Sequence, residues 1–85
     1  MHHQLEIFPD TIRIERIDPD RNMRRFYRMR LQPDLFGGVH LLREWGRVGA
    51  SGQVMCDHYQ DAGKAVTALL TLYRAKLRRG YELTV

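Results

Sequence analysis

The chain has 85 residues, with 14 Lys and Arg against 10 Asp and Glu, a formal net charge of +4 and a hydrophobic content of 44%. This length fits one domain, and the composition is too apolar for an intrinsically disordered chain. The single cysteine, Cys56, excludes an internal disulfide and a multi-cysteine zinc site. Because no apolar run approaches the length of a membrane span and the first residues lack an export-signal pattern, we expect a soluble, cytoplasmic protein.

The first two predicted elements are strands. Alternating apolar and charged residues over 11–17 predict a half-buried strand, and the polar residues 18–22 predict a turn. Residues 24–31 predict a second strand with two unlike faces. The expected core face carries Tyr27, Met29 and Leu31, and the expected basic outer face carries Arg24, Phe26, Arg28 and Arg30.

A hairpin and a helix follow. Residues 39–48 and 53–59 predict two strands joined by the turn 49–52, whose two glycines can take a positive φ. The spacing of apolar residues then changes to the helical period, which predicts an amphipathic helix over about 61–79. Asp61 is its expected N-cap, and Gly80 suits the position after its end.

These elements predict an α+β fold with one domain over residues 1–85. Strands joined by short loops and followed by one helix imply a four-stranded antiparallel sheet, paired in chain order, with the C-terminal helix packed across one face. We expect Val66, Leu69 and Tyr73 of the helix to pack on the core face of the second strand. The tail from Tyr81 is expected to dock as a short extended segment.

The most unusual local sequence surrounds Trp45, the only tryptophan. Arg43 and Arg47 lie two positions away on either side, so all three side chains project from one strand face. Gly46 between them permits a close approach to the backbone. A ring flanked by guanidinium groups suits the stacking of a base and the binding of its phosphates. The alternative is a core tryptophan with the arginines packed along it.

The segment Trp45-Gly46-Arg47-Val48-Gly49, followed by Ser51-Gly52-Gln53, resembles the signature of the WGR domain family. Phe26-Tyr27 in the preceding strand agrees with the pattern, as does the helix that ends in Arg79-Gly80-Tyr81. The resemblance runs over about residues 18–82.

This resemblance implies a function. In eukaryotic poly(ADP-ribose) polymerases the domain helps to bind DNA breaks, with its Trp against the terminal nucleotide and its Arg in phosphate or interdomain contacts. Those positions are Trp45 and Arg47 here. The family also has stand-alone bacterial members, and we expect this chain to be one of them.

The sequence therefore predicts a non-enzymatic module that binds DNA at ends, nicks or single-stranded junctions. Trp45 would stack on a base, Arg43 and Arg47 would hold phosphates, and Arg28 and Arg30 would add attraction. The alternative is a protein-interaction module that uses the same tryptophan and arginine surface. The basic end of the helix, Arg74 to Arg79, is a solvated face or an extension of the nucleic-acid surface.

We expect no catalytic residue, cofactor, small-molecule substrate or metal. Cys56 and His58 share a strand face, but the sequence offers no further cysteine or histidine at a spacing that completes a four-ligand site. The expectation is a buried cysteine beside a histidine at the rim.

Overall fold

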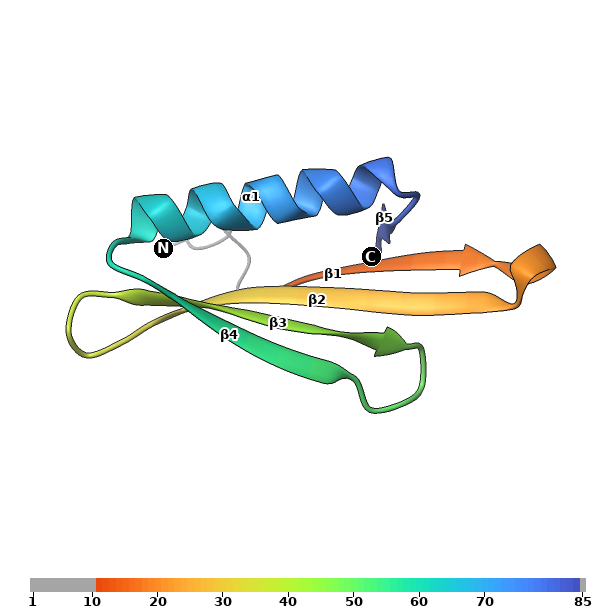
Figure 1. The fold of residues 1–85 in the computed structure, drawn as a ribbon, viewed down its shortest axis with the longest axis horizontal. Helices are drawn as coiled ribbons and strands as arrows, with labels where there is room; N and C mark the ends of the chain where they lie inside the picture. Colours follow the sequence, from red (N-terminus) through yellow and green to blue (C-terminus); the bar gives the residue numbers. More distant parts are fainter. Residues whose placement is uncertain (1–10, 85) are drawn as a thin grey trace, which may run out of the picture.

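A computed structural model describes residues 11–84 and shows an antiparallel sheet with one helix across one face (Figure 1). The sheet order is β4-β3-β2-β1-β5. The strands are β1 (Thr11–Asp18), β2 (Met23–Pro33), β3 (Val39–Arg47), β4 (Gln53–Tyr59) and β5 (Glu82–Leu83), with the 3₁₀ turn η2 (Pro19–Arg21) between β1 and β2 and the helix α1 (Ala62–Arg78) between β4 and β5.

The expected α+β class and the sequential pairing of the first four strands are confirmed, but the expected number of strands is wrong. The tail forms a fifth strand, in which Leu83 pairs with Ile14 at the free edge of β1. Gly80 makes this return possible, because its φ of +96° turns the chain back at the end of the helix. A two-residue strand is too short for alternation to reveal it.

The turn between β3 and β4 uses its two glycines for different reasons. Gly49 has the expected positive φ of +88°. Gly52 does not have a positive φ. It is needed for space instead: a Cβ atom there would lie 2.4 Å from the carbonyl oxygen of Trp45 and 2.9 Å from the ring of Phe26. The hairpin can close tightly only without that side chain.

The core lies between α1 and the sheet. Its main cluster consists of buried side chains from β1, β2, β3, α1 and the segment after the helix: Ile14, Tyr27, Met29, Leu41, Leu69 and Tyr81. The predicted burial of Tyr27, Met29 and Leu69 is confirmed, whereas Leu31, Val66 and Tyr73 are only partly buried. One helix covers one sheet face, so the domain has a single apolar layer.

The helix begins and ends as the sequence predicts. The carboxylate of Asp61 accepts a hydrogen bond of 2.8 Å from the backbone N–H of Lys64, which confirms the N-cap.

Among the described residues, no helix is long and apolar enough to cross a membrane.

The sheet face away from the helix has one unexpected feature. Phe26 lies on this face, as predicted, yet it is only 4% exposed. The Arg13 guanidinium covers the ring at 4.6 Å from its centroid, and Gly46 and Gly52 leave room for the ring against the hairpin. The aromatic ring that we expected to be exposed on a basic outer face is therefore buried beneath Arg13.

The central position of Leu69 gives a stability prediction. Leu69→Ala removes a buried side chain from the only apolar layer, so we expect it to destabilise the domain by about 2–5 kcal/mol. Leu70→Ala is the matched control, because Leu70 is 36% exposed on the same helix and we expect it to cost only about 0.5 kcal/mol. Urea unfolding followed by circular dichroism measures both, and equal losses would contradict this placement of the core.

Candidate nucleic-acid interface

Three arginines form a row across the sheet. Arg25 of β2 lies directly opposite Arg16 of β1 on one side and Arg47 of β3 on the other. Directly opposite residues share a sheet face, and the next row along the strands holds Ile14, Tyr27 and Trp45. The arginine row thus lies on the helix-bearing face, at the end of the sheet above which α1 ends (Figure 1).

Aromatic rings border this row. Trp45 is partly buried and stacks on Tyr27, with ring centroids 5.6 Å apart and planes 11° apart. The Nζ atom of Lys76 lies 4.4 Å from the Tyr27 centroid and 5.6 Å from that of Tyr81. These side chains border a groove of about 440 Å³ together with Arg25 and Arg47. Its lining is Arg25, Phe26, Tyr27, Trp45, Gly46, Arg47, Lys76 and Tyr81.

Neither the arginine row nor Lys76 has an acidic partner in the part of the chain that the structure describes. Among the ion pairs between residues 11–84, none involves Arg16, Arg25, Arg47 or Lys76. Like charges directly opposite in a sheet are destabilising. Burial lowers the pKa of Lys76, and the nearby Arg79, Arg43 and Arg25 lower it further. The groove therefore disfavours its own positive charges and would favour an anion.

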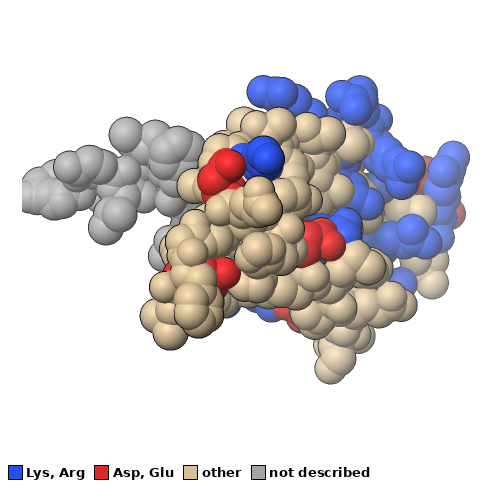
Figure 2. Space-filling view, turned by 60° about the vertical axis from the view of Figure 1, so that its left-hand side comes forward, with Lys and Arg blue, Asp and Glu red and all other residues tan. Residues whose placement is uncertain are grey.

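The basic side chains are unevenly distributed over the molecule. Figure 2 shows Lys and Arg gathered toward one side, whereas the end of the molecule that comes forward in that view carries few of them. The end with the arginine row also holds the basic last turn of α1, with Lys76 and Arg78. Such an asymmetry steers a polyanion toward one end of the domain.

Arg47 and Arg43 flank Trp45 on the helix-bearing face, as predicted, but they differ in their partners. Arg47 is exposed and donates a long hydrogen bond of 3.3 Å to the carbonyl oxygen of Asn22. Arg43 is partly buried, pairs with Asp57 at 3.0 Å and donates to the hydroxyl of Tyr27 at 3.4 Å. The guanidinium of Arg43 already has an anionic partner, whereas that of Arg47 does not.

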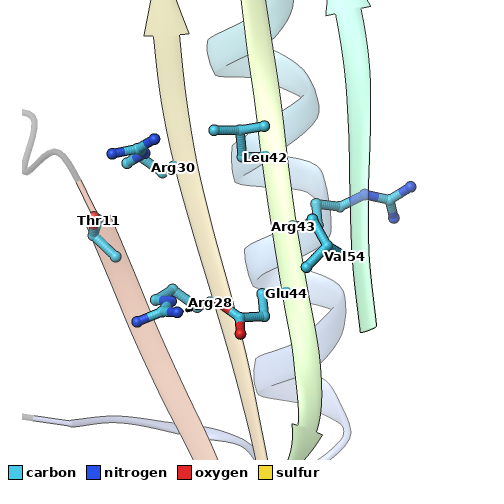
Figure 3. Close-up of a pocket in the computed structure, with 7 residues that line it drawn as sticks. All are labelled: Thr11, Arg28, Arg30, Leu42, Arg43, Glu44 and Val54. Carbon is cyan, nitrogen blue, oxygen red and sulfur yellow. Dashed lines mark hydrogen bonds and ion pairs between the residues drawn. The ribbon is translucent and has the colours of Figure 1, made fainter. Parts of the chain in front are cut away.

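Of the other three predicted site residues, only Gly46 lines the groove beside Trp45. Gly46 faces the ring of Phe26 and the Cα of Gly52, so the close approach that it permits is made by the protein itself. Arg28 and Arg30 lie on the opposite sheet face from Trp45, beside a groove of about 390 Å³ (Figure 3). The structure therefore does not bring the six predicted residues together on one surface.

The groove on the open face is electrostatically different. Arg28 forms an ion pair with Glu44, which is its direct partner on β3. Arg30 donates a 2.9 Å hydrogen bond to the amide oxygen of Gln32. Figure 3 shows Arg28 directed toward Glu44, while Arg43 extends away over β4. This face compensates part of its charge internally.

The sequence singled out neither Arg16 nor Arg25 as a site residue. It indicated Lys76 only as part of a basic helix end that could extend a nucleic-acid surface, and Tyr81 only in the family pattern and the tail. Because Arg25 and Tyr27 are two positions apart on β2, strand alternation would have placed Arg25 on the correct face. The alignment with Arg16 and Arg47, however, depends on strand register. The expectation that Cys56 is buried is also wrong: it is exposed, because β4 is an edge strand and the helix covers only the other face.

Comparisons with known proteins agree with this architecture. Residues 10–84 match the family model of the WGR domain. An uncharacterized protein, y4dW, of Sinorhizobium fredii is 48% identical over 74 residues, which are 87% of this chain. The chain spans only about a third of that relative, 36% of its length. No solved structure matches. The match over nearly the whole chain places it in the WGR domain family, a family of binding rather than catalytic modules that contact nucleic acid in poly(ADP-ribose) polymerase-like proteins.

Proposed function

We propose that this domain binds DNA without catalysing a reaction, and that it recognises ends, nicks or single-stranded junctions in the groove beside Trp45. The observation that carries the proposal is the uncompensated row of Arg16, Arg25 and Arg47 next to a stacked aromatic pair. Like charges directly opposite each other in a sheet are destabilising. A row of phosphates would supply the missing negative charge.

The spacing of the groove suits a nucleotide. Successive residues on one strand face are about 6–7 Å apart, so the ring of Trp45 and the guanidinium of Arg47 can reach a base and its own phosphate. Tyr27 is already covered by Lys76 and contacts Trp45. Trp45 is the more accessible ring, which makes it the surface on which a terminal base would stack. A continuous duplex cannot offer that base without being unstacked, so an end or a nick is favoured.

Each residue of the groove then has a separate role. Arg47 and Arg25 contact phosphates, and Lys76 adds a partly desolvated charge near the rings. Arg43 is a positioning residue: it is neutralised by Asp57 and holds the Tyr27 hydroxyl. Arg28 and Arg30 on the opposite face contribute only to the long-range attraction.

A salt titration tests whether phosphates are the ligand. If Arg16, Arg25, Arg47 and Lys76 each neutralise a phosphate, log K falls with log[salt] at a slope of roughly −3 to −4 on duplex DNA. Fluorescence anisotropy with a labelled blunt duplex measures this slope. The same duplex closed by loops at both ends is the control for end recognition. Absence of binding even at low salt would favour the protein-partner alternative, and equal affinity for both duplexes would exclude preferential binding to ends.

Two arginine variants, one on each sheet face, test which face binds DNA. We expect Arg25→Gln to weaken binding and to reduce the salt slope by about one unit. It should also leave the domain equally or more stable, by up to about 1 kcal/mol, because it relieves the like-charge contacts with Arg16 and Arg47. Arg30→Gln removes the same charge from the opposite face and should change affinity far less. Equal effects of both variants on affinity would assign binding to net charge and not to the groove.

The tryptophan variant tests stacking. Loss of base–aromatic stacking is worth about 1–3 kcal/mol, so we expect Trp45→Ala to weaken end binding by about 5- to 150-fold. The variant also loses contacts with Tyr27, so its melting temperature should fall. Affinity is therefore measured well below that temperature, on protein that circular dichroism shows to be folded. A folded variant with unchanged affinity would contradict the stacking role.

A further inference from the structure

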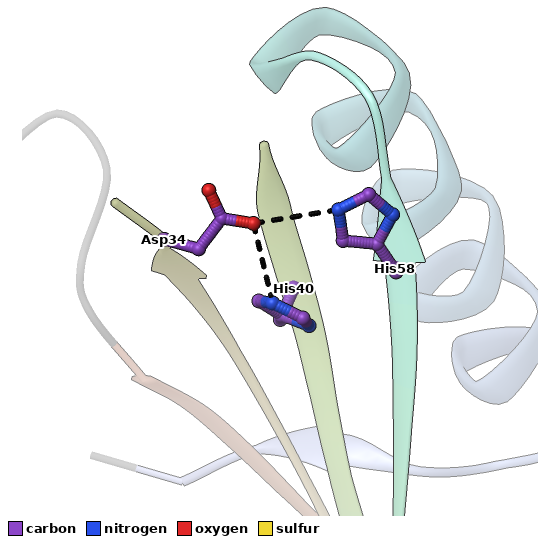
Figure 4. A group of neighbouring side chains, drawn as sticks. All are labelled: Asp34, His40 and His58. Atoms are coloured by element: carbon purple, nitrogen blue, oxygen red, sulfur yellow. Dashed lines mark ion pairs between the residues drawn. The ribbon is translucent and has the colours of Figure 1, made fainter. Parts of the chain in front are cut away.

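Three potential metal ligands meet at the end of the sheet opposite the arginine row (Figure 4). His40 of β3 and His58 of β4 are direct cross-strand partners on the open face. Asp34 comes from the loop between β2 and β3, and one of its oxygens, Oδ2, lies 3.4 Å from the Nε2 atom of each histidine. Figure 4 shows this oxygen directed between the two rings. The ligand atoms all lie within 4.8 Å of one another.

The loop fixes the orientation of Asp34. Its other oxygen, Oδ1, accepts hydrogen bonds from the backbone N–H groups of Phe36 at 2.8 Å and Gly38 at 2.9 Å. These bonds, the former above all, lower the pKa of the Asp34 carboxyl, so it is ionised at neutral pH. The loop thus holds Oδ1 of the carboxylate, and Oδ2 remains available for another partner. A ligating carboxylate with its own hydrogen bonds is typical of metal sites.

The distances fit a tetrahedral metal centre. Zinc binds imidazole nitrogen and carboxylate oxygen at about 2.0–2.2 Å, which places neighbouring ligand atoms of a tetrahedron about 3.3–3.5 Å apart. Both Oδ2–Nε2 distances have that value. The two rings meet edge to face with centroids 4.9 Å apart, and both Nε2 atoms lie near the same Oδ2 atom of Asp34. The ligand atoms of the two histidines lie within 4.8 Å of each other.

The backbone leaves space at this point. Gly38 is buried, and a Cβ atom there would lie 2.6 Å from the Nε2 of His58 and 2.8 Å from the Oδ2 of Asp34. Its φ is not in the left-handed region, so conformational freedom does not explain this glycine. A side chain would occupy the space where the ligand atoms converge.

A fourth residue supports one of the ligands. The Sγ atom of Cys56 lies 3.4 Å from the Nδ1 atom of His40. If Nε2 binds a metal, Nδ1 carries the ring proton, and this N–H group can donate a hydrogen bond to the sulfur. Such outer contacts fix the tautomer and the orientation of a ligating histidine. Cys56 therefore supports His40 and is not itself a ligand.

We propose that Asp34, His40 and His58 form a Zn²⁺ site that fastens the β2–β3 loop to β3 and β4. Two imidazoles and one carboxylate supply three ligands, and the exposed side of His58 leaves the fourth position to water. The expectation of no metal came from spacing along the chain, whereas these ligands come from three separate elements. The site is independent of the proposed DNA groove.

The test uses the full chain with His2→Ala and His3→Ala in every sample, because these two histidines could bind metal themselves. Isothermal titration with Zn²⁺ should show one saturable site and a rise in melting temperature that a chelator reverses. Co²⁺ should give the visible absorption of a tetrahedral centre. We expect His58→Gln and Asp34→Asn each to weaken Zn²⁺ binding by more than tenfold and to abolish the rise in melting temperature.

Two further variants separate a built site from general histidine affinity. Cys56→Ser keeps all three ligands and an acceptor for the His40 ring N–H, so it should weaken binding by less than the roughly 10- to 100-fold that loss of such an outer contact costs. Gly38→Ala fills the space between the ligand atoms and should abolish binding while circular dichroism still shows a folded domain. The absence of saturable Zn²⁺ binding would overturn the proposal, as would unchanged binding in both His58→Gln and Asp34→Asn.

Discussion

The contacts of Tyr27 hold together the end of the domain that carries Trp45. Its ring is buried in the middle of β2, stacks on Trp45 and lies beneath the ammonium group of Lys76. Its hydroxyl accepts a hydrogen bond from Arg43, which is itself held by Asp57 of β4. One side chain thereby connects two further strands and the helix. The groove can present Trp45 in a fixed orientation because Tyr27 supports it from within the core.

The two faces of the sheet differ in how their charged side chains are paired. On the helix-bearing face the apolar layer ends at the arginine row, where like charges face one another without an acid. On the open face charges are distributed differently: Arg28 pairs with Glu44, and Arg13 pairs with Glu15 while covering Phe26. The open face also has two arginines directly opposite each other, Arg13 and Arg28, but each of them has an acidic partner. The arginine row has no such partner among residues 11–84.

The two proposed sites occupy opposite ends of the same strands. At one end β3 contributes Trp45 and Arg47, and at the other it contributes His40. A metal bound near His40 would fix the end of β3 that adjoins the β2–β3 loop, and β3 carries Trp45 near its other end. Since β3 pairs with both β2 and β4 along its length, it is a stiff connection between the two sites.

By itself the sequence determined the local features of this protein. Alternation identified the core face of β2, the apolar stripe and Asp61 marked the helix, and the Trp45-Gly46-Arg47 signature identified the family. Each of these depends on neighbours within a few residues. Only the tertiary structure decided that Arg16, Arg25 and Arg47 align, that Arg28 and Arg30 face away from Trp45, and that Asp34 meets His40 and His58. The physical reason is that the alternation of side chains between the two faces is a property of one strand. The register between strands is set by turns and long-range packing.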